Sequence, residues 1–329
     1  MSDMALVVTD KQSGDGALLA SATLDGIACA VLWQRRLGDL KTVLFTPEGL
    51  TGHLFQAPAL IANANLHRLY CAALPVRDEE VEIVDAVLDR PSLREIVWLD
   101  HHHLHGDFLT RLHRRRATIV HDADQPSSAA LLATHLSAND EVGAALCRLV
   151  DGGGAQMPEP WSHWFYVFLA VREDPYQIRR AVQPLVEGRF EAFDPVLRDA
   201  GRELWSTIDE LAAQTYHQVA LGEDRLAVVG LPMSQELDFR LLADRIMRRH
   251  DLQFTLLFFD DLHRLILRGN PQRLSPETFR RLQHRLEEQG LPLFLYDRHT
   301  VFIEPREANK RTAIEDVLSL LTSSFSPAS

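Results

Sequence analysis

The chain has 329 residues, of which 46% are hydrophobic and 24% are charged, the balance of an ordinary globular protein with room for a sizeable core. Lys and Arg number 34 against 46 Asp and Glu, so the formal net charge is −12. This charge argues against a non-specific grip on long duplex nucleic acid, which needs a basic surface. A small anionic substrate in a local basic or metal-lined cleft is compatible with it.

Short apolar runs alternate with amphipathic stretches up to residue 150. We expect strands at 17–21, 42–45, 67–74, 95–99 and 117–120, and helices at 27–36 and 79–88. Strands separated by helices imply crossover connections and a mostly parallel, doubly wound α/β sheet. Ligands of such sheets gather outside the carboxyl ends of the strands, where Asp25 and Asp100 fall.

Helical patterns continue over 126–221 and end in a long amphipathic stretch at 193–219. An α/β pattern then returns, with strands expected at 225–231, 252–259, 263–268, 292–296 and 299–303 and helices at 236–249 and 275–288. We therefore predict a first α/β domain over 1–190, a linker helix over 191–221, and a second, smaller α/β domain over 222–329.

The three cysteines, Cys29, Cys71 and Cys147, lie far apart in apolar runs and form no Cys-x-x-Cys pair. This pattern predicts buried thiols in a reducing compartment. The N-terminus has no basic stretch followed by a long apolar run, and no apolar run approaches the ~18 residues of a membrane span. We therefore expect a cytoplasmic protein.

The most informative segment is Asp100, His101 and His102, which directly follow the strand expected at 95–99. A carboxylate and imidazoles at the carboxyl end of a buried strand are typical of a metal site. Carboxylate oxygens suit Mn²⁺ or Mg²⁺, and imidazole shifts the preference toward Mn²⁺. The alternative is a surface loop in a chain that contains 15 histidines.

The run VWLDHHH resembles the motif that names the DHH phosphoesterase superfamily, which includes RecJ-like exonucleases and oligoribonucleases. The run ALLASATLDGIACAVL is similar to the family's first motif, a strand that ends in an Asp-x-Asp-Gly turn, and the later half resembles the family's smaller, DHH-associated domain. The resemblance implies a cleft between two domains, two divalent metals in it, and hydrolysis of phosphoester bonds.

The metal ligands that the resemblance implies are only partly present. The family's ligands to one metal correspond to Asp25, His101 and Asp151, and all three are in place. At the positions of the other metal's ligands stand residues that hold a divalent cation poorly: Leu19 or Ser21, Thr23, and, for the bridging Asp, Ala73. The resemblance thus implies one Mn²⁺ or Mg²⁺ ion rather than two. Substitute ligands are the alternative, and the candidates near the site are His103, His105, Asp107 and Asp15.

The resemblance also implies roles for other side chains. Asp100 would orient His101, and His102 would contact the phosphate, which makes Asp100 and His102 the candidate catalytic residues. Arg268 ends a run similar to the strand that presents a substrate-contacting arginine, although a solvated strand-end arginine is the alternative. Arg114 and Arg115 belong to the basic run 111–116, which either steers a polyanionic substrate or forms the solvated face of a short helix.

Two functions stay open from the sequence. The first is a metal-dependent phosphoesterase of the DHH type that hydrolyses or binds short oligonucleotides or nucleotide-like phosphoesters. The second is a catalytically degenerate relative that binds a nucleotide, a nucleic-acid end or a protein partner without hydrolysis. We expect neither long duplex nucleic acid nor a membrane as partner, and a homodimer stays open.

Overall fold

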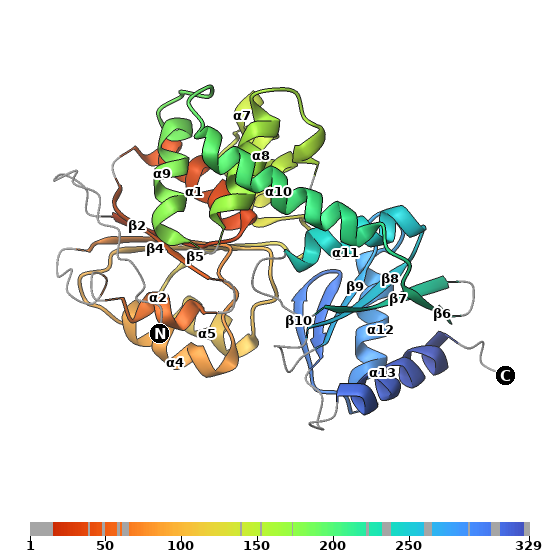
Figure 1. Ribbon diagram of the computed structural model, residues 1–329. Helices are drawn as coiled ribbons and strands as arrows, with labels where there is room; N and C mark the ends of the chain where they lie inside the picture. Colours follow the sequence, from red (N-terminus) through yellow and green to blue (C-terminus); the bar gives the residue numbers. More distant parts are fainter. Residues whose placement is uncertain are drawn as a thin grey trace. The chain divides into compact units, whose positions relative to one another are not determined.

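The computed structural model describes residues 16–38, 40–47, 50–57, 60, 66–138, 140–151, 153–172, 174–221, 224–231, 238–259, 265–288, 290–303 and 310–325. The chain divides into two compact units, Met1–Glu203 and Leu204–Ser329 (Figure 1). Each unit is built around its own sheet. Among the described residues, no helix combines the length and the apolar character that a bilayer span requires.

The sheet of the first unit has five strands in the order β2-β1-β3-β4-β5, and all its pairs are parallel. The strands are β1 (Gly16–Ser21), β2 (Leu40–Thr46), β3 (Arg68–Ala72), β4 (Glu95–Asp100) and β5 (Thr118–His121). Each coincides with a predicted strand to within two residues at either end. The expected doubly wound α/β architecture is therefore confirmed.

Helices cover both faces of this sheet (Figure 1). On one face lie α2 (Thr51–Phe55), α4 (Val81–Leu88) and α5 (Gly106–Arg114), whose apolar side chains share one core with the strands. On the other face α1 (Leu24–Leu37) contacts α6 (Ser128–His135), α7 (Glu141–Val150), α8 (Trp161–Val171) and α9 (Pro175–Val186). Trp98 in β4 belongs to this core and is fully buried. Its ring centroid lies 6.1 Å from that of Phe55 and 4.9 Å from that of Phe108.

The predicted linker helix over 191–221 is too long. Helix α10 spans Pro195–Ala212, and the division between the two units falls inside it, after Glu203. His217–Leu221 forms strand β6 instead of helix, because its backbone pairs antiparallel with β7 (Asp224–Leu231). A hairpin partner several residues further along the chain thus overrides the helical pattern of the sequence.

The sheet of the second unit has six strands in the order β10-β11-β9-β8-β7-β6. Its remaining strands are β8 (Phe254–Phe259), β9 (Leu265–Gly269), β10 (Leu293–Asp297) and β11 (Thr300–Ile303). Only β7 and β8 pair in parallel, and α11 (Phe239–His250) makes the crossover between them. Helices α12 (Pro276–Glu288) and α13 (Lys310–Phe325) pack on the sheet in a second core, and α13 was not foreseen from the sequence.

Candidate functional site

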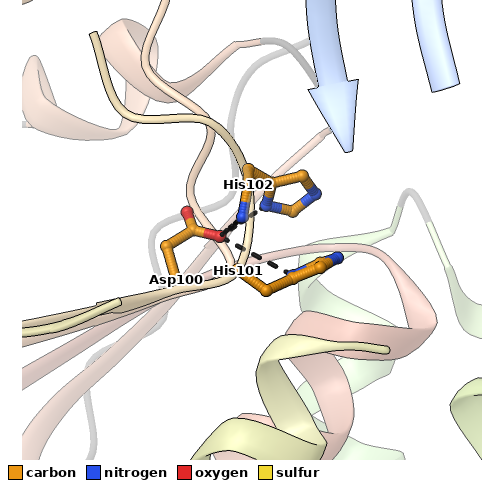
Figure 2. Close-up of side chains that lie close together, drawn as sticks. All are labelled: Asp100, His101 and His102. Atoms are coloured by element: carbon orange, nitrogen blue, oxygen red, sulfur yellow. Dashed lines mark hydrogen bonds and ion pairs between the residues drawn. The ribbon is translucent and has the colours of Figure 1, made fainter. Parts of the chain in front are cut away.

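Strand β4 delivers the Asp-His-His segment to the carboxyl edge of the first sheet. The strand is hydrogen-bonded between β3 and β5, and its last residue, Asp100, lies opposite His121. The chain bends directly after it, so that the side chains of Asp100, His101 and His102 gather at this edge (Figure 2). All three are buried, with exposed fractions of 0%, 1% and 3%. The alternative of a solvated surface loop therefore does not hold for them.

Asp100 is a buried, ionised carboxylate. Its Oδ1 accepts a hydrogen bond from the backbone N–H of His102 at 2.9 Å and lies 2.5 Å from Nδ1 of that ring. Burial by itself would raise the pKa of Asp100, but the charge and the hydrogen bonds of His102, with a smaller contribution from His101, lower this pKa to about 2. Its Oδ2 is buried and receives no hydrogen bond from the described part of the chain.

Asp100, which was expected to orient His101, lies closer to the ring of His102. Nδ1 of His101 lies 3.9 Å from Oδ1 of Asp100 but only 2.8 Å from the hydroxyl of Ser128 and 3.4 Å from Oδ2 of Asp25. The ring of His101 is thus held from the side of α6 and α1. Two neighbouring imidazoles have different supports, although their centroids are 4.2 Å apart.

Asp25 joins the first turn of α1 to the start of α6. Its carboxylate is fully buried and accepts hydrogen bonds from the backbone N–H groups of Ser128 at 2.9 Å and Ala129 at 2.8 Å. The first N–H groups of a helix have no intrahelical partner and carry partial positive charge, so a carboxylate there is favourable. Each oxygen of Asp25 therefore already serves as an acceptor for α6.

One group of side chains among the described residues has the geometry of a metal site. Asp100, His101 and His102 each offer one ligand atom, and these atoms lie within 4.8 Å of one another. The ligand set implied by the resemblance is not gathered in this way, because Asp25 and Asp151 do not join the group. Asp151 is the exposed residue that ends α7.

The positions of the second metal's ligands are filled by packing and by neutral hydroxyls. The hydroxyls of Ser21 and Thr23 lie 2.7 Å apart, and Thr23 also accepts the N–H of Gly26 at 3.2 Å as the N-cap of α1. Leu19 is fully buried in the core. Ala73 is fully buried at the end of β3 with a φ of 52°. None of these four side chains offers a charge.

The proposed substitute ligands do not form a second group of three among the described residues. His103 and His105 have ring centroids 5.5 Å apart, and Nδ1 of His105 lies 3.3 Å from Asp78. Asp107 is exposed in the first turn of α5. Asp15 lies outside the described residues.

The basic run 111–116 faces acidic residues of α4. Arg111 pairs with Asp85 at 3.0 Å, and Arg115 pairs with Asp85 at 3.3 Å and with Asp89. Arg114 is exposed in the last turn of α5. The guanidinium groups at 111 and 115 are therefore engaged in ion pairs between two neighbouring helices, which favours the solvated-face interpretation for this part of the run.

Arg268 is held inside the second unit, with an exposed fraction of 8%. Its Nε and Nη2 donate to the two oxygens of Asp244 at 2.7 and 2.9 Å, and its Nη1 donates to Thr300 at 2.6 Å and to Asp297 at 3.3 Å. Burial would lower the pKa of Arg268, but the two aspartates raise it above its ordinary value. These contacts favour a structural role over the expected contact with a phosphate.

The sequence analysis did not find Ser128 among the functional residues. The order Pro126, Ser127, Ser128 marks a helix start, and α6 does begin at Ser128. The serine that contacts His101 could not be told from the one that caps the helix, because that distinction depends on where α6 meets β4.

A scan against models of protein families finds no match to this chain, and a search of curated proteins finds none either. Among solved structures, the chain is similar to the pGpG-specific phosphodiesterase PggH from Vibrio cholerae, with a TM-score of 0.50 and 12% identity over 93% of this chain and 99% of PggH. Manganese-bound RecJ from Thermus thermophilus gives a TM-score of 0.48 and 12% identity over 94% of this chain and 52% of RecJ. CDC45 from Entamoeba histolytica gives a TM-score of 0.48 and 9% identity over 95% of this chain and 96% of CDC45. The likeness to PggH covers nearly the whole of both chains and shows a shared fold, as the resemblance in the sequence implied.

Proposed function

We propose that this chain is a phosphoesterase-like protein of the DHH type that takes short oligonucleotides or nucleotide-like phosphoesters at a centre of one divalent ion. The observation that carries the proposal is the buried carboxylate of Asp100, whose pKa is lowered to about 2 and whose Oδ2 receives no hydrogen bond from the described residues. A buried anionic oxygen without a donor is costly unless a cation neutralises it. Its imidazole neighbours complete a donor set that suits Mn²⁺.

Asp100, His101 and His102 would hold the ion, since one donor atom from each lies within 4.8 Å of the other two. A bound Mn²⁺ or Mg²⁺ would polarise a phosphoryl oxygen of the ligand. Asp100 also fixes the ring of His102 through the contact at 2.5 Å. In this arrangement His102 would serve as a ligand of the ion, in place of the direct contact with the phosphate that the resemblance implies. Of the ligands implied by the resemblance, we retain His101 and assign Asp25 to the support of α6.

Hydrolysis at such a centre should be slow. Two-metal enzymes use both ions to clamp the attacking and leaving oxygens. The second ion's positions hold Thr23 and Ala73, which supply no charged donor. Loss of one ion and of the bridging carboxylate should cost several kcal/mol of transition-state stabilisation, on the order of a thousandfold in rate.

A second candidate function is binding without any hydrolysis, with a nucleotide, a nucleic-acid end or a protein as partner. The observation that favours it is the hydrogen bond of 2.7 Å between the hydroxyls of Ser21 and Thr23, which closes this part of the site with neutral groups.

Cys29, Cys71 and Cys147 are free thiols, in keeping with a proposed cytoplasmic location.

The experiment that tests the proposal measures bound metal and then ligand. After incubation with excess Mn²⁺ and desalting, we expect a single ion per chain by elemental analysis. His101→Ala should abolish metal binding, whereas His103→Ala, which changes an exposed imidazole outside the group, should not. Isothermal titration with pGpG, the dinucleotide of the Vibrio enzyme, should show binding that requires Mn²⁺.

Release of product from bis(4-nitrophenyl) phosphate and from pGpG then separates the two candidate functions. Slow release that requires Mn²⁺ supports the phosphoesterase, and binding without release supports the non-hydrolytic alternative. Two ions per chain would contradict the one-ion centre. Failure to bind both Mn²⁺ and the dinucleotide would overturn the proposed function as a whole.

A further inference from the structure

The first residue of α6, Ser128, contacts the Asp-His-His segment at three atoms. Its Oγ accepts the backbone N–H of His101 at 3.2 Å, lies 2.8 Å from Nδ1 of the same residue, and lies 3.3 Å from Oδ1 of Asp100, to which it can donate. Ser128 is fully buried, so these contacts are shielded from competition by solvent. The fold thus places one hydroxyl between the carboxylate of Asp100 and the ring of His101.

The chemistry of the partners fixes the direction of these hydrogen bonds. The hydroxyl of Ser128 lies 3.3 Å from Oδ1 of Asp100 and donates its single proton to this carboxylate oxygen. The oxygen of Ser128 then has only lone pairs to offer to His101. It accepts from the backbone N–H and, at 2.8 Å, from an N–H at Nδ1 of the ring.

Asp25 also favours a proton on Nδ1 of His101. Its Oδ2 lies 3.4 Å from Nδ1 of His101, and a carboxylate at this distance favours a proton on that nitrogen. The position of Asp25 is set by the two backbone N–H groups at the start of α6, because they donate to its two oxygens at 2.9 and 2.8 Å. Two acceptors from α1 and α6 therefore meet at Nδ1 of His101.

A proton on Nδ1 determines what the other ring nitrogen offers. A neutral imidazole carries one proton, so its Nε2 then presents a lone pair. Imidazole ligands of metals are commonly oriented by a hydrogen bond from the other ring nitrogen, and the loss of such a partner typically weakens metal binding about 10- to 100-fold. Ser128 and Asp25 occupy that place for His101.

We propose that Ser128 is a positioning residue that, with Asp25, holds the proton of His101 on Nδ1 and so leaves the lone pair of this ring on Nε2 as the donor for a metal ion. The part of this inference that concerns metal rests on the proposed function above. The part that concerns the proton does not, because it follows from the hydrogen bonds of the metal-free chain.

The neighbouring serine supplies a matched control. Ser127 is the N-cap of α6, and its hydroxyl accepts the N–H of Ala130 at 3.1 Å. Ser127→Ala removes a helix cap, which costs about 1 kcal/mol of stability, but leaves the contacts of His101 in place. Ser128→Ala removes the hydroxyl that contacts His101, and Ser128→Thr retains a hydroxyl at that position.

The decisive measurement is the ¹⁵N NMR spectrum of the histidine rings in the metal-free full chain at pH 8, with His101 assigned from its absence in His101→Asn. We expect the proton of His101 on Nδ1 in the wild type, in Ser127→Ala and in Ser128→Thr. In Ser128→Ala a substantial fraction of His101 should carry its proton on Nε2. A wild-type ring that is protonated mainly on Nε2 would overturn the inference, and this result requires no variant to fold.

A titration with Mn²⁺ forms the second arm. Ser128→Ala should weaken Mn²⁺ binding at least about tenfold, while Ser127→Ala should leave the affinity within a factor of about two. Equal affinities and equal proton positions in both alanine variants would contradict the inference. If the wild type binds no Mn²⁺ at all, the one-ion centre of the proposed function fails, and the proton position of His101 alone still decides the role of Ser128.

Discussion

Replacement of the buried carboxylate by an amide, Asp100→Asn, should change how stability depends on pH. The pKa of Asp100 is lowered from its ordinary value of 3.8 to about 2, with the charge and the hydrogen bonds of His102 as the main lowering cause against the opposing effect of burial. At about 1.4 kcal/mol for each pKa unit, the lowering corresponds to about 2 kcal/mol in favour of the folded state with a charged Asp100.

The direction of the effect follows from the lowered pKa. The unfolded chain takes up the proton near pH 4 and the folded chain near pH 2, so the contribution of Asp100 is complete above about pH 4 and is lost as the pH falls toward 2. The difference in unfolding free energy between wild type and Asp100→Asn should therefore be largest near pH 5. It should shrink steadily as the pH approaches 2.

Urea denaturation at several pH values between 2 and 5, in the presence of a chelator, measures this difference. Asp107→Asn is the matched control, because Asp107 is an exposed carboxylate close to the same segment and its replacement should leave the difference near zero. A difference for Asp100→Asn that stays constant over this pH range, or that is absent at pH 5, would refute the assignment of Asp100 as an ionised partner of His102.

Three further predictions concern residues outside the metal group. Arg268→Met should destabilise the second unit toward urea by about 3–5 kcal/mol, since it leaves the buried Asp297 and the partly buried Asp244 without their cation. Arg273→Met, which breaks an exposed ion pair, should cost less than about 1 kcal/mol. A stable Arg268→Met variant with weakened ligand binding would instead indicate that Arg268 contacts the phosphate. Thr23→Ala should lower stability by about 1 kcal/mol, because it removes the N-terminal cap of α1. A change in the amount of bound metal in this variant would show that Thr23 is a metal ligand. Arg115→Ala should leave dinucleotide affinity unchanged in low salt, because the guanidinium group of Arg115 forms ion pairs with Asp85 and Asp89. A clear loss of affinity would show that Arg115 contributes to ligand binding.

The parallel sheet of the first unit could be predicted because its strands other than β5 at the edge are largely buried. Buried parallel strands are continuous apolar runs, as in 96–99, and turns separate them from amphipathic helices. The edge at which their carboxyl ends meet is then fixed, and this placed Asp25 and Asp100 on the same side of the sheet from the sequence alone. The structure brings both side chains to within hydrogen-bond distance of residues at the start of α6.

The partners within the site could not be predicted, since they come from distant parts of the chain. Ser128 contacts His101 across 27 residues, and the two aspartates of Arg268 are 24 and 29 residues away from it. A pattern of residue types shows that a carboxylate and imidazoles lie together but not which hydrogen bonds they share. The same reason explains β6, whose pairing with β7 overrides a local helical pattern.

The residues around the second metal's positions have structural roles of their own in this fold, and this bears on what a metal would add. Thr23 caps α1, and the oxygens of Asp25 hold the first N–H groups of α6. A metal ion would have to compete with these N–H donors for the oxygens of Thr23 and Asp25. The edge of the sheet is therefore organised by its own hydrogen bonds, and among the side-chain oxygens of Thr23, Asp25 and Asp100 the one left without a donor is Oδ2 of Asp100. A cation at this edge would meet one carboxylate oxygen in need of charge, which is the physical reason to expect one ion and a site already formed before the ion binds.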